Sequence, residues 1–198
     1  MNYQKISGIM LFWCGAIVLM GIISAEAMYP SGYTTNLNEI SDLGGTKPPN
    51  SLIYQPSAFI FNTTFLMSGL MVLIGTFFQH MYFKKIIFSI PMFLFGLGLL
   101  GIGVFPGDKA PYHGMASMLT FLAGGLSPIM SYKVVSSPFK FTGFVCGLVA
   151  LAMWSIIVFS PEVLLSFMGI GLVERWIAYP IMLWLIGFGG YLMNNKTT

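Results

Sequence analysis

The sequence predicts an all-α integral membrane protein with a single bundle of six transmembrane helices. Only 8% of its 198 residues are charged, against about a quarter in an ordinary soluble domain. Hydrophobic residues make up 56%, and the mean hydropathy is +0.81. A soluble domain of this length could not bury that much apolar surface, so lipid must surround most of it. The same composition excludes a disordered chain, a coiled coil and a basic nucleic-acid-binding protein.

Six apolar stretches are long enough to cross about 30 Å of hydrocarbon at about 1.5 Å per residue. We expect them at residues 6–28, 57–80, 86–105, 111–132, 141–159 and 176–193. The connections are short except for 29–56 and 160–175, so successive helices should be antiparallel neighbours. Residues 25–27 (Ala-Glu-Ala) resemble a signal-peptide cleavage site, but the preceding apolar run exceeds a typical signal peptide. We therefore expect a retained first span and keep cleavage as the alternative.

The loop charges predict the orientation of the bundle. Six lysines fall on the side of the two termini and three basic residues on the other, which predicts cytoplasmic termini. All six acidic residues lie on the outer side, and no charge is expected at mid-membrane, which disfavours an ion-coupled core site. We expect a prokaryotic cytoplasmic membrane. The inner lysines are Lys5, Lys84, Lys85, Lys133, Lys140 and Lys196.

A weak internal repeat accompanies the helices. The segment 64–70 (TFLMSGL) recurs 56 residues later as 120–126 (TFLAGGL), which suggests three helical hairpins in parallel orientation. Chance similarity among apolar segments is the alternative. Gly143 and Gly147 form a small-residue motif that permits close helix packing, within one bundle or, less favoured, in a dimer.

The long first loop, residues 29–56, has too few apolar residues for a core of its own. We expect it to lie over the outer end of the bundle as a lid. Its polar segment includes Asn38, Glu39, Ser41 and Asp42. A purely structural interpretation is that Thr35 or Asn36 caps a short helix that ends at residues 44–45 (Gly-Gly).

A second polar group is predicted at the start of the fourth span. Asp108 precedes that helix, His113 lies in its first turn, and Ser117 follows one turn deeper on the same face. A hydrogen-bonded Asp–His–Ser line could activate a hydroxyl group. The alternative is that Asp108 caps the helix and His113 has no special role. Asn62, one turn inside the second span, needs a polar partner from this layer.

The fifth connection begins Ser-Pro-Glu at residues 160–162, which predicts a short helix in the membrane interface. Arg175, the only arginine, is expected where the sixth span begins. Its guanidinium could bind a carboxylate or a phosphate of a ligand. Pairing with Glu26 or Asp108 is the favoured alternative.

No metal or cofactor is predicted. His80 and His113 are expected at opposite membrane faces and therefore cannot share a haem iron. One outward histidine is too few for a histidine-rich zinc site. A calcium site at Glu39, Asp42 and Asp108 would lack the usual loop signature.

Several of these stretches together resemble a known family. Residues 38–44 (NEISDLG), 61–62 (FN), 105–108 (FPGD) and 113–114 (HG) are similar to the domain-of-unknown-function family 998 (DUF998), six-span membrane proteins of bacteria and archaea. The resemblance implies a six-helix membrane protein and no established activity. It also implies that Ser41, Asp42, Asn62, Asp108 and His113 belong together.

The leading functional hypothesis is an outward-facing polar pocket that binds or senses a small molecule or lipid head group. A membrane-embedded enzyme acting on a lipid or isoprenoid, with Asp108 and His113 as acid and base, is the second hypothesis. A small transporter or channel and an accessory subunit are the others. Expected partners are membrane lipids, with a homo-oligomer or larger membrane complex as alternatives and no nucleic acid. The candidate ligand-binding residues are Asn38, Glu39, Ser41, Asp42, Asn62, Ser117 and Arg175.

Overall fold

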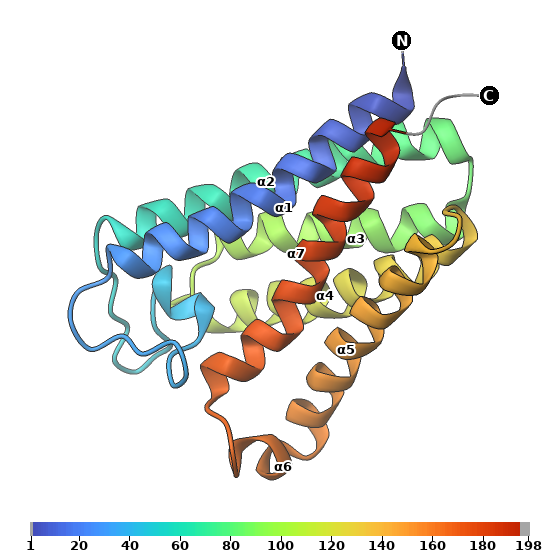
Figure 1. The fold of residues 1–198 in the computed structure, drawn as a ribbon. Helices are drawn as coiled ribbons and strands as arrows, with labels where there is room; N and C mark the ends of the chain where they lie inside the picture. Colours follow the sequence, from blue (N-terminus) through green and yellow to red (C-terminus); the bar gives the residue numbers. More distant parts are fainter. Residues whose placement is uncertain (1, 195–198) are drawn as a thin grey trace.

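The computed structural model describes residues 2–194, and these residues form helices and connecting loops (Figure 1). Six helices are long and apolar enough to cross a membrane, which confirms the predicted six-helix membrane bundle. The long helices are α1 (Tyr3–Ala27), α2 (Ser57–Phe83), α3 (Ile86–Val104), α4 (Ala110–Met130), α5 (Phe139–Phe159) and α7 (Ile170–Asn194). The short helices are η1 (Ile40–Leu43), η2 (Ser131–Lys133) and α6 (Pro161–Leu165).

Each long helix packs on the next along the chain, and α7 completes the bundle by packing on α1, α5 and α4. The start of α1 and the end of α7 lie at one end of the bundle, whereas the first loop and α6 lie at the other (Figure 1). The core between α3 and α7 is aromatic: the rings of Trp184 and Phe188 stack at 5.1 Å, and Phe88 packs edge-on against Phe188 at 5.4 Å. All three side chains are buried. We call the end that carries the first loop and α6 the outer end, and the opposite end the inner end.

The last long helix begins six residues before the predicted residue 176, so the expected boundary was wrong. Asn36 of the first loop explains the earlier start. Its side-chain Oδ1 accepts a hydrogen bond from Gly169 N at 2.9 Å, and its carbonyl accepts one from Leu172 N at 3.2 Å. These bonds satisfy amide groups that a helix N-terminus leaves without an intrahelical partner. Glu174 and Arg175 therefore lie inside α7 rather than in front of it.

The same threonine–glycine contact occurs in the first two hairpins. A Cβ atom on Gly21 of α1 would lie 2.3 Å from Thr64 Oγ1 of α2, and one on Gly98 of α3 would lie 2.4 Å from Thr120 Oγ1 of α4. Thr64 and Thr120 are the first residues of the two recurring segments. The two recurring segments thus make the same type of contact with the preceding helix in the first two hairpins.

The small-residue motif of α5 packs within the bundle. A Cβ atom on Gly143 would lie 2.9 Å from the Pro128 carbonyl oxygen, and one on Gly147 would lie 2.5 Å from the Gly125 carbonyl oxygen. Both acceptors belong to α4. The motif therefore brings α5 close to α4, as expected for small residues between membrane helices.

The close approach of α3 and α4 can be tested with Gly98→Ala. The new Cβ would lie 2.7 Å from Thr120 N, a main-chain atom that cannot move without separating the helices. Because overpacking of this kind costs about 1–3 kcal/mol, we expect a lower Tm in detergent. Gly190→Ala is the matched control, since a Cβ there meets nothing within 4 Å. Equal Tm values for the two variants would contradict this packing.

Candidate functional site

The first loop folds against the outer ends of three helices. Its short helix η1 packs on α1, α2 and α7. Ile40 and Leu43 of η1 are both buried in the main hydrophobic core. The loop is therefore an integral part of the outer end of the bundle.

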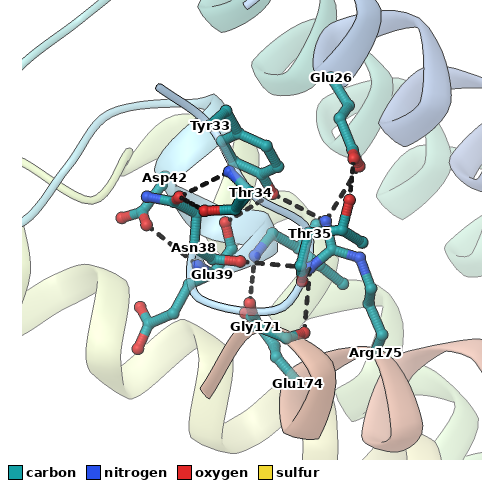
Figure 2. Close-up of polar contacts among 11 residues, drawn as sticks. Glu26, Tyr33, Thr34, Thr35, Asn38, Glu39, Asp42, Gly171, Glu174 and Arg175 are labelled. Carbon is teal, nitrogen blue, oxygen red and sulfur yellow. Dashed lines mark hydrogen bonds and ion pairs between the residues drawn. The ribbon is translucent and has the colours of Figure 1, made fainter. Parts of the chain in front are cut away.

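A buried guanidinium on α7 holds this loop in place (Figure 2). Arg175 is only 3% exposed. It donates hydrogen bonds to three main-chain carbonyls, one phenol oxygen and one carboxylate. The acceptors are Thr35 O (2.8 Å), Asn38 O (3.2 Å), Gly171 O (3.0 Å), Tyr33 OH (2.8 Å) and Glu26 Oε2 (3.0 Å).

These bonds assign Arg175 a structural role. The ion pair with Glu26 confirms the alternative favoured by the sequence. Both terminal nitrogens are occupied, so a ligand could bind them only by displacing the present acceptors. Tyr33 remains a neutral phenol because burial raises its pKa, although the Arg175 bond opposes that rise. Its hydroxyl group accepts from Arg175 and donates to the Glu39 carbonyl at 3.0 Å.

Glu174, the preceding residue of α7, binds the same loop at another point. Its Oε2 accepts a hydrogen bond from the main-chain N–H of Ile40, the first residue of η1. Adjacent residues of one helix thus contact both the start of η1 and the segment before it. Sequence analysis assigned no role to Glu174, because its importance depends on where α7 begins.

Most of the predicted loop residues stabilise the loop itself. Asp42 Oδ2 accepts from Glu39 N at 3.0 Å, so Glu39 is the N-cap of η1, and the expected cap at Thr35 or Asn36 was wrong. The helix ends at Gly44, as predicted. Burial, followed by the nearby Glu39 carboxylate, raises the pKa of Asp42. Asn38 Oδ1 accepts from Thr34 N at 2.8 Å.

The predicted hydrogen-bonded Asp–His–Ser line is wrong. His113 is 3% exposed, and its Nδ1 lies 2.7 Å from the Phe105 carbonyl, so Nδ1 carries the hydrogen and Nε2 remains available. Asp108 instead pairs with Lys109 at 2.9 Å. Among residues 2–194 no hydrogen bond joins Asp108, His113 and Ser117.

Asn62 and Asp108 lie next to the glycines that end the loop helix. Asn62 Nδ2 donates to the Gly44 carbonyl at 3.4 Å. A Cβ atom on Gly45 would lie 3.7 Å from Asp108 Oδ1. The stretches that carry the family resemblance thus meet in one layer at the outer end. Within that layer Asn62 and Asp108 adjoin the glycines, whereas Ser41 and His113 line a cleft.

This cleft has a volume of about 540 Å³ and lies between α4, α5, α7 and the first loop. The ribbon of α5 diverges from that of α4 toward α6 at this end (Figure 1). Polar residues of the first loop and of the outer turns of α4 and α7 line the cleft, together with apolar residues of the three helices. The polar residues are Glu39, Ser41, Lys47, His113, Ser117 and Glu174. The apolar residues include Met118, Phe121, Trp154, Ile157, Val158, Phe159, Ile170, Val173 and Ile177.

Four of the predicted site residues therefore share this cleft: Glu39, Ser41, His113 and Ser117. The other five do not line it: Asn38, Asp42, Asn62, Asp108 and Arg175. Lys47 and Glu174 line the cleft but were not predicted. Lys47 pairs with Glu39 at 2.6 Å, which places its ammonium at the polar side of the cleft.

The attachment of the loop can be tested with Arg175→Met. This change removes every donor of the guanidinium and leaves buried carbonyls without partners, which we expect to cost about 3 kcal/mol. Hydrogen–deuterium exchange of residues 33–45 should accelerate. Lys109→Met removes an ion pair whose lysine side chain is 61% exposed, so exchange should change little. Unchanged loop exchange in Arg175→Met would contradict the role assigned to this residue.

Comparison with known proteins agrees with the fold. A family model described as "Protein of unknown function (DUF998)" matches residues 12–191. No curated protein and no solved structure matches the chain. The family match covers most of the chain and includes every helix that lines the cleft. The chain belongs to the DUF998 family.

Proposed function

We propose that the cleft binds an amphipathic molecule, such as a lipid or an isoprenoid compound. Its head group would lie against the loop side and its chain along the helices. The observation that carries the proposal is the mixed lining, with six polar residues from the first loop and the outer turns of α4 and α7, and apolar residues along α4, α5 and α7. This arrangement matches the two parts of an amphipathic ligand.

The size of the cleft and the exposure of α5 support this proposal. A volume of about 540 Å³ lies within the usual range for ligand pockets, about 300–1,000 Å³. In the most apolar stretch of α5 only 17% of the residues are buried inside the bundle, whereas the corresponding share is 39–44% in the other long helices. A lipid could therefore enter beside α5 from the membrane.

The polar side offers several types of contact to a head group. Lys47 is an exposed cation paired with Glu39, and Glu174 is a carboxylate whose Oε2 binds Ile40 N. His113 has a free Nε2, since its Nδ1 binds Phe105. A head group with hydroxyl or phosphate oxygens could use both the lysine and the imidazole.

Gly114→Leu provides a direct test. Gly114 lines the cleft, and a Cβ there meets nothing within 4 Å, so a leucine would occupy cleft space without straining the backbone. We expect the wild type to retain a lipid through mild detergent purification, measured by mass spectrometry of extracts. The amount of that lipid retained by Gly114→Leu should be at least tenfold lower than in the wild type.

Gly190→Leu is the matched control, because Gly190 is also helical with open space beside it but does not line the cleft. It should retain the lipid at the wild-type level. The retained species, added back, should raise the Tm of the wild type and not of Gly114→Leu. Equal lipid contents in all three proteins would refute the proposal.

An enzyme that acts on such a lipid is the second candidate. It is favoured by His113, whose ring is held by the Phe105 carbonyl while Nε2 stays available in the same cleft as Ser117 and Glu174. An imidazole in this position can transfer a proton to or from a bound head group. Asp108 pairs with Lys109 and does not line the cleft, so Glu174 suits a carboxylate role better than Asp108.

His113→Gln separates the two candidates. If the protein is an enzyme, turnover of the co-purified lipid in proteoliposomes should fall about 10²- to 10⁴-fold, the usual contribution of a general acid or base. Lipid retention should change much less, because glutamine preserves a polar side chain of similar size. Retained turnover would remove His113 from catalysis, whereas no turnover in the wild type would leave binding as the function.

We also propose that the start of α1 and the end of α7 face the cytoplasm of a prokaryotic cell. Support comes from the charges of the described residues. Lys5, Lys84, Lys85, Lys133 and Lys140 belong to the inner end, whereas all six acidic residues belong to the outer end. An excess of lysine is typical of the cytoplasmic side. The cleft would then open on the outer side of the membrane.

A further inference from the structure

A second groove lies at the inner end of the bundle, between α4 and α5. It has a volume of about 480 Å³ and is separate from the outer cleft, since no residue lines both. Its apolar walls run along two membrane-spanning helices and its polar residues lie where those helices end. The lining residues are Ile129, Met130, Tyr132, Lys133, Phe141 and Phe144.

Two lysines flank this groove. Lys133 ends η2 and lines the groove directly. Lys140, in the first turn of α5, places its Nζ 4.9 Å from the centre of the Tyr132 ring and 5.0 Å from that of Phe141. Aromatic rings attract an ammonium over their faces and so restrict where it lies. Lys140 is therefore held near the polar end of the groove, which Lys133 lines.

Neither lysine has a carboxylate partner in the described part of the chain. The ion pairs found there involve only Lys47, Lys109 and Arg175. The six acidic residues all belong to the outer end, so none can neutralise these lysines across the bundle. Within residues 2–194, no acidic side chain is therefore available to these two lysines.

We propose that this groove binds an anionic glycerophospholipid of the surrounding membrane. Its phosphate would lie between Lys133 and Lys140, and an acyl chain would follow Ile129, Met130 and Phe144 along the helices. The apolar part is already exposed to the membrane, with Phe141 53% and Phe144 44% exposed. Basic pockets between transmembrane helices recognise lipid head groups in this way.

A second groove at the inner end, between α2 and α3, differs from this one in its lining. The groove between α2 and α3 is lined by apolar residues together with Thr76, His80 and Ser89, and no lysine lines it. Lys84 and Lys85 lie in the connection between those helices but outside both grooves. The groove between α4 and α5 alone combines lysine with an apolar wall among the inner grooves described here.

The experiment compares phosphatidylglycerol with phosphatidylcholine of the same chains, bound to the purified full-length protein and counted by native mass spectrometry. Lys133→Gln and Lys140→Gln should each weaken phosphatidylglycerol binding about fivefold, the effect of one basic residue at an anionic surface. The double variant should bind it no better than phosphatidylcholine. Phe144→Ala should weaken both lipids, because it removes part of the apolar wall.

Lys84→Gln/Lys85→Gln is the matched control, with the same loss of charge at the same end. It should leave phosphatidylglycerol binding unchanged. Lys140→Arg keeps the cation over the rings and should bind phosphatidylglycerol as the wild type does. That result would exclude a folding defect as the cause of the loss in Lys140→Gln. Equal losses in the two double variants would overturn the proposal in favour of diffuse attraction, as would equal wild-type binding of both lipids. Neither result bears on the outer cleft, because Gly114→Leu tests that site independently.

Discussion

The outer end of this protein depends on a single buried cation. A guanidinium is costly to remove from water unless its donors are satisfied. The two terminal nitrogens of Arg175 meet that requirement with acceptors that come mostly from the first loop. The loop in turn has few apolar residues, of which Ile40 and Leu43 reach the core. Arg175 therefore determines where the loop lies, and the loop determines where Glu39, Ser41 and Lys47 meet the cleft.

The attachment works in both directions. Asn36 caps the start of α7, while Arg175 and Glu174 of α7 bind the loop. Neither segment would keep this conformation alone, because each satisfies polar main-chain groups of the other. Glu174 also lines the cleft. A head group that competes for its carboxyl group would weaken the hydrogen bond that Ile40 N donates to Glu174 Oε2. Under the proposed function, ligand binding and loop position would be linked through this one side chain.

The membrane fold could be predicted from the sequence because length and apolarity suffice to identify a span. The start of α7 could not, since Asn36, which caps it, lies more than 130 residues away.

The Asp–His–Ser line failed for a related reason. Helical spacing placed three side chains on one face. The main-chain carbonyl of Phe105, at the end of α3, instead accepts the hydrogen bond from His113 Nδ1. Spacing between side chains does not reveal main-chain acceptors from a neighbouring helix end. The stretches that carry the family resemblance do lie together, because they surround the first loop.

The cleft itself has an identifiable cause in the sequence of α5. Gly143 and Gly147 in its inner half allow α5 to approach the main chain of α4 closely. The outer half carries Trp154, Ile157 and Phe159 in place of glycine, and bulky side chains keep helix axes apart. A helix that is close to its neighbour at one end and separated from it at the other must diverge from it, as α5 does from α4 toward α6 (Figure 1). The outer cleft and the inner groove both lie along this helix, the least buried of the six spans. The change from small to bulky residues along α5 therefore accounts both for its close contact with α4 at the inner end and for the cleft beside it at the outer end.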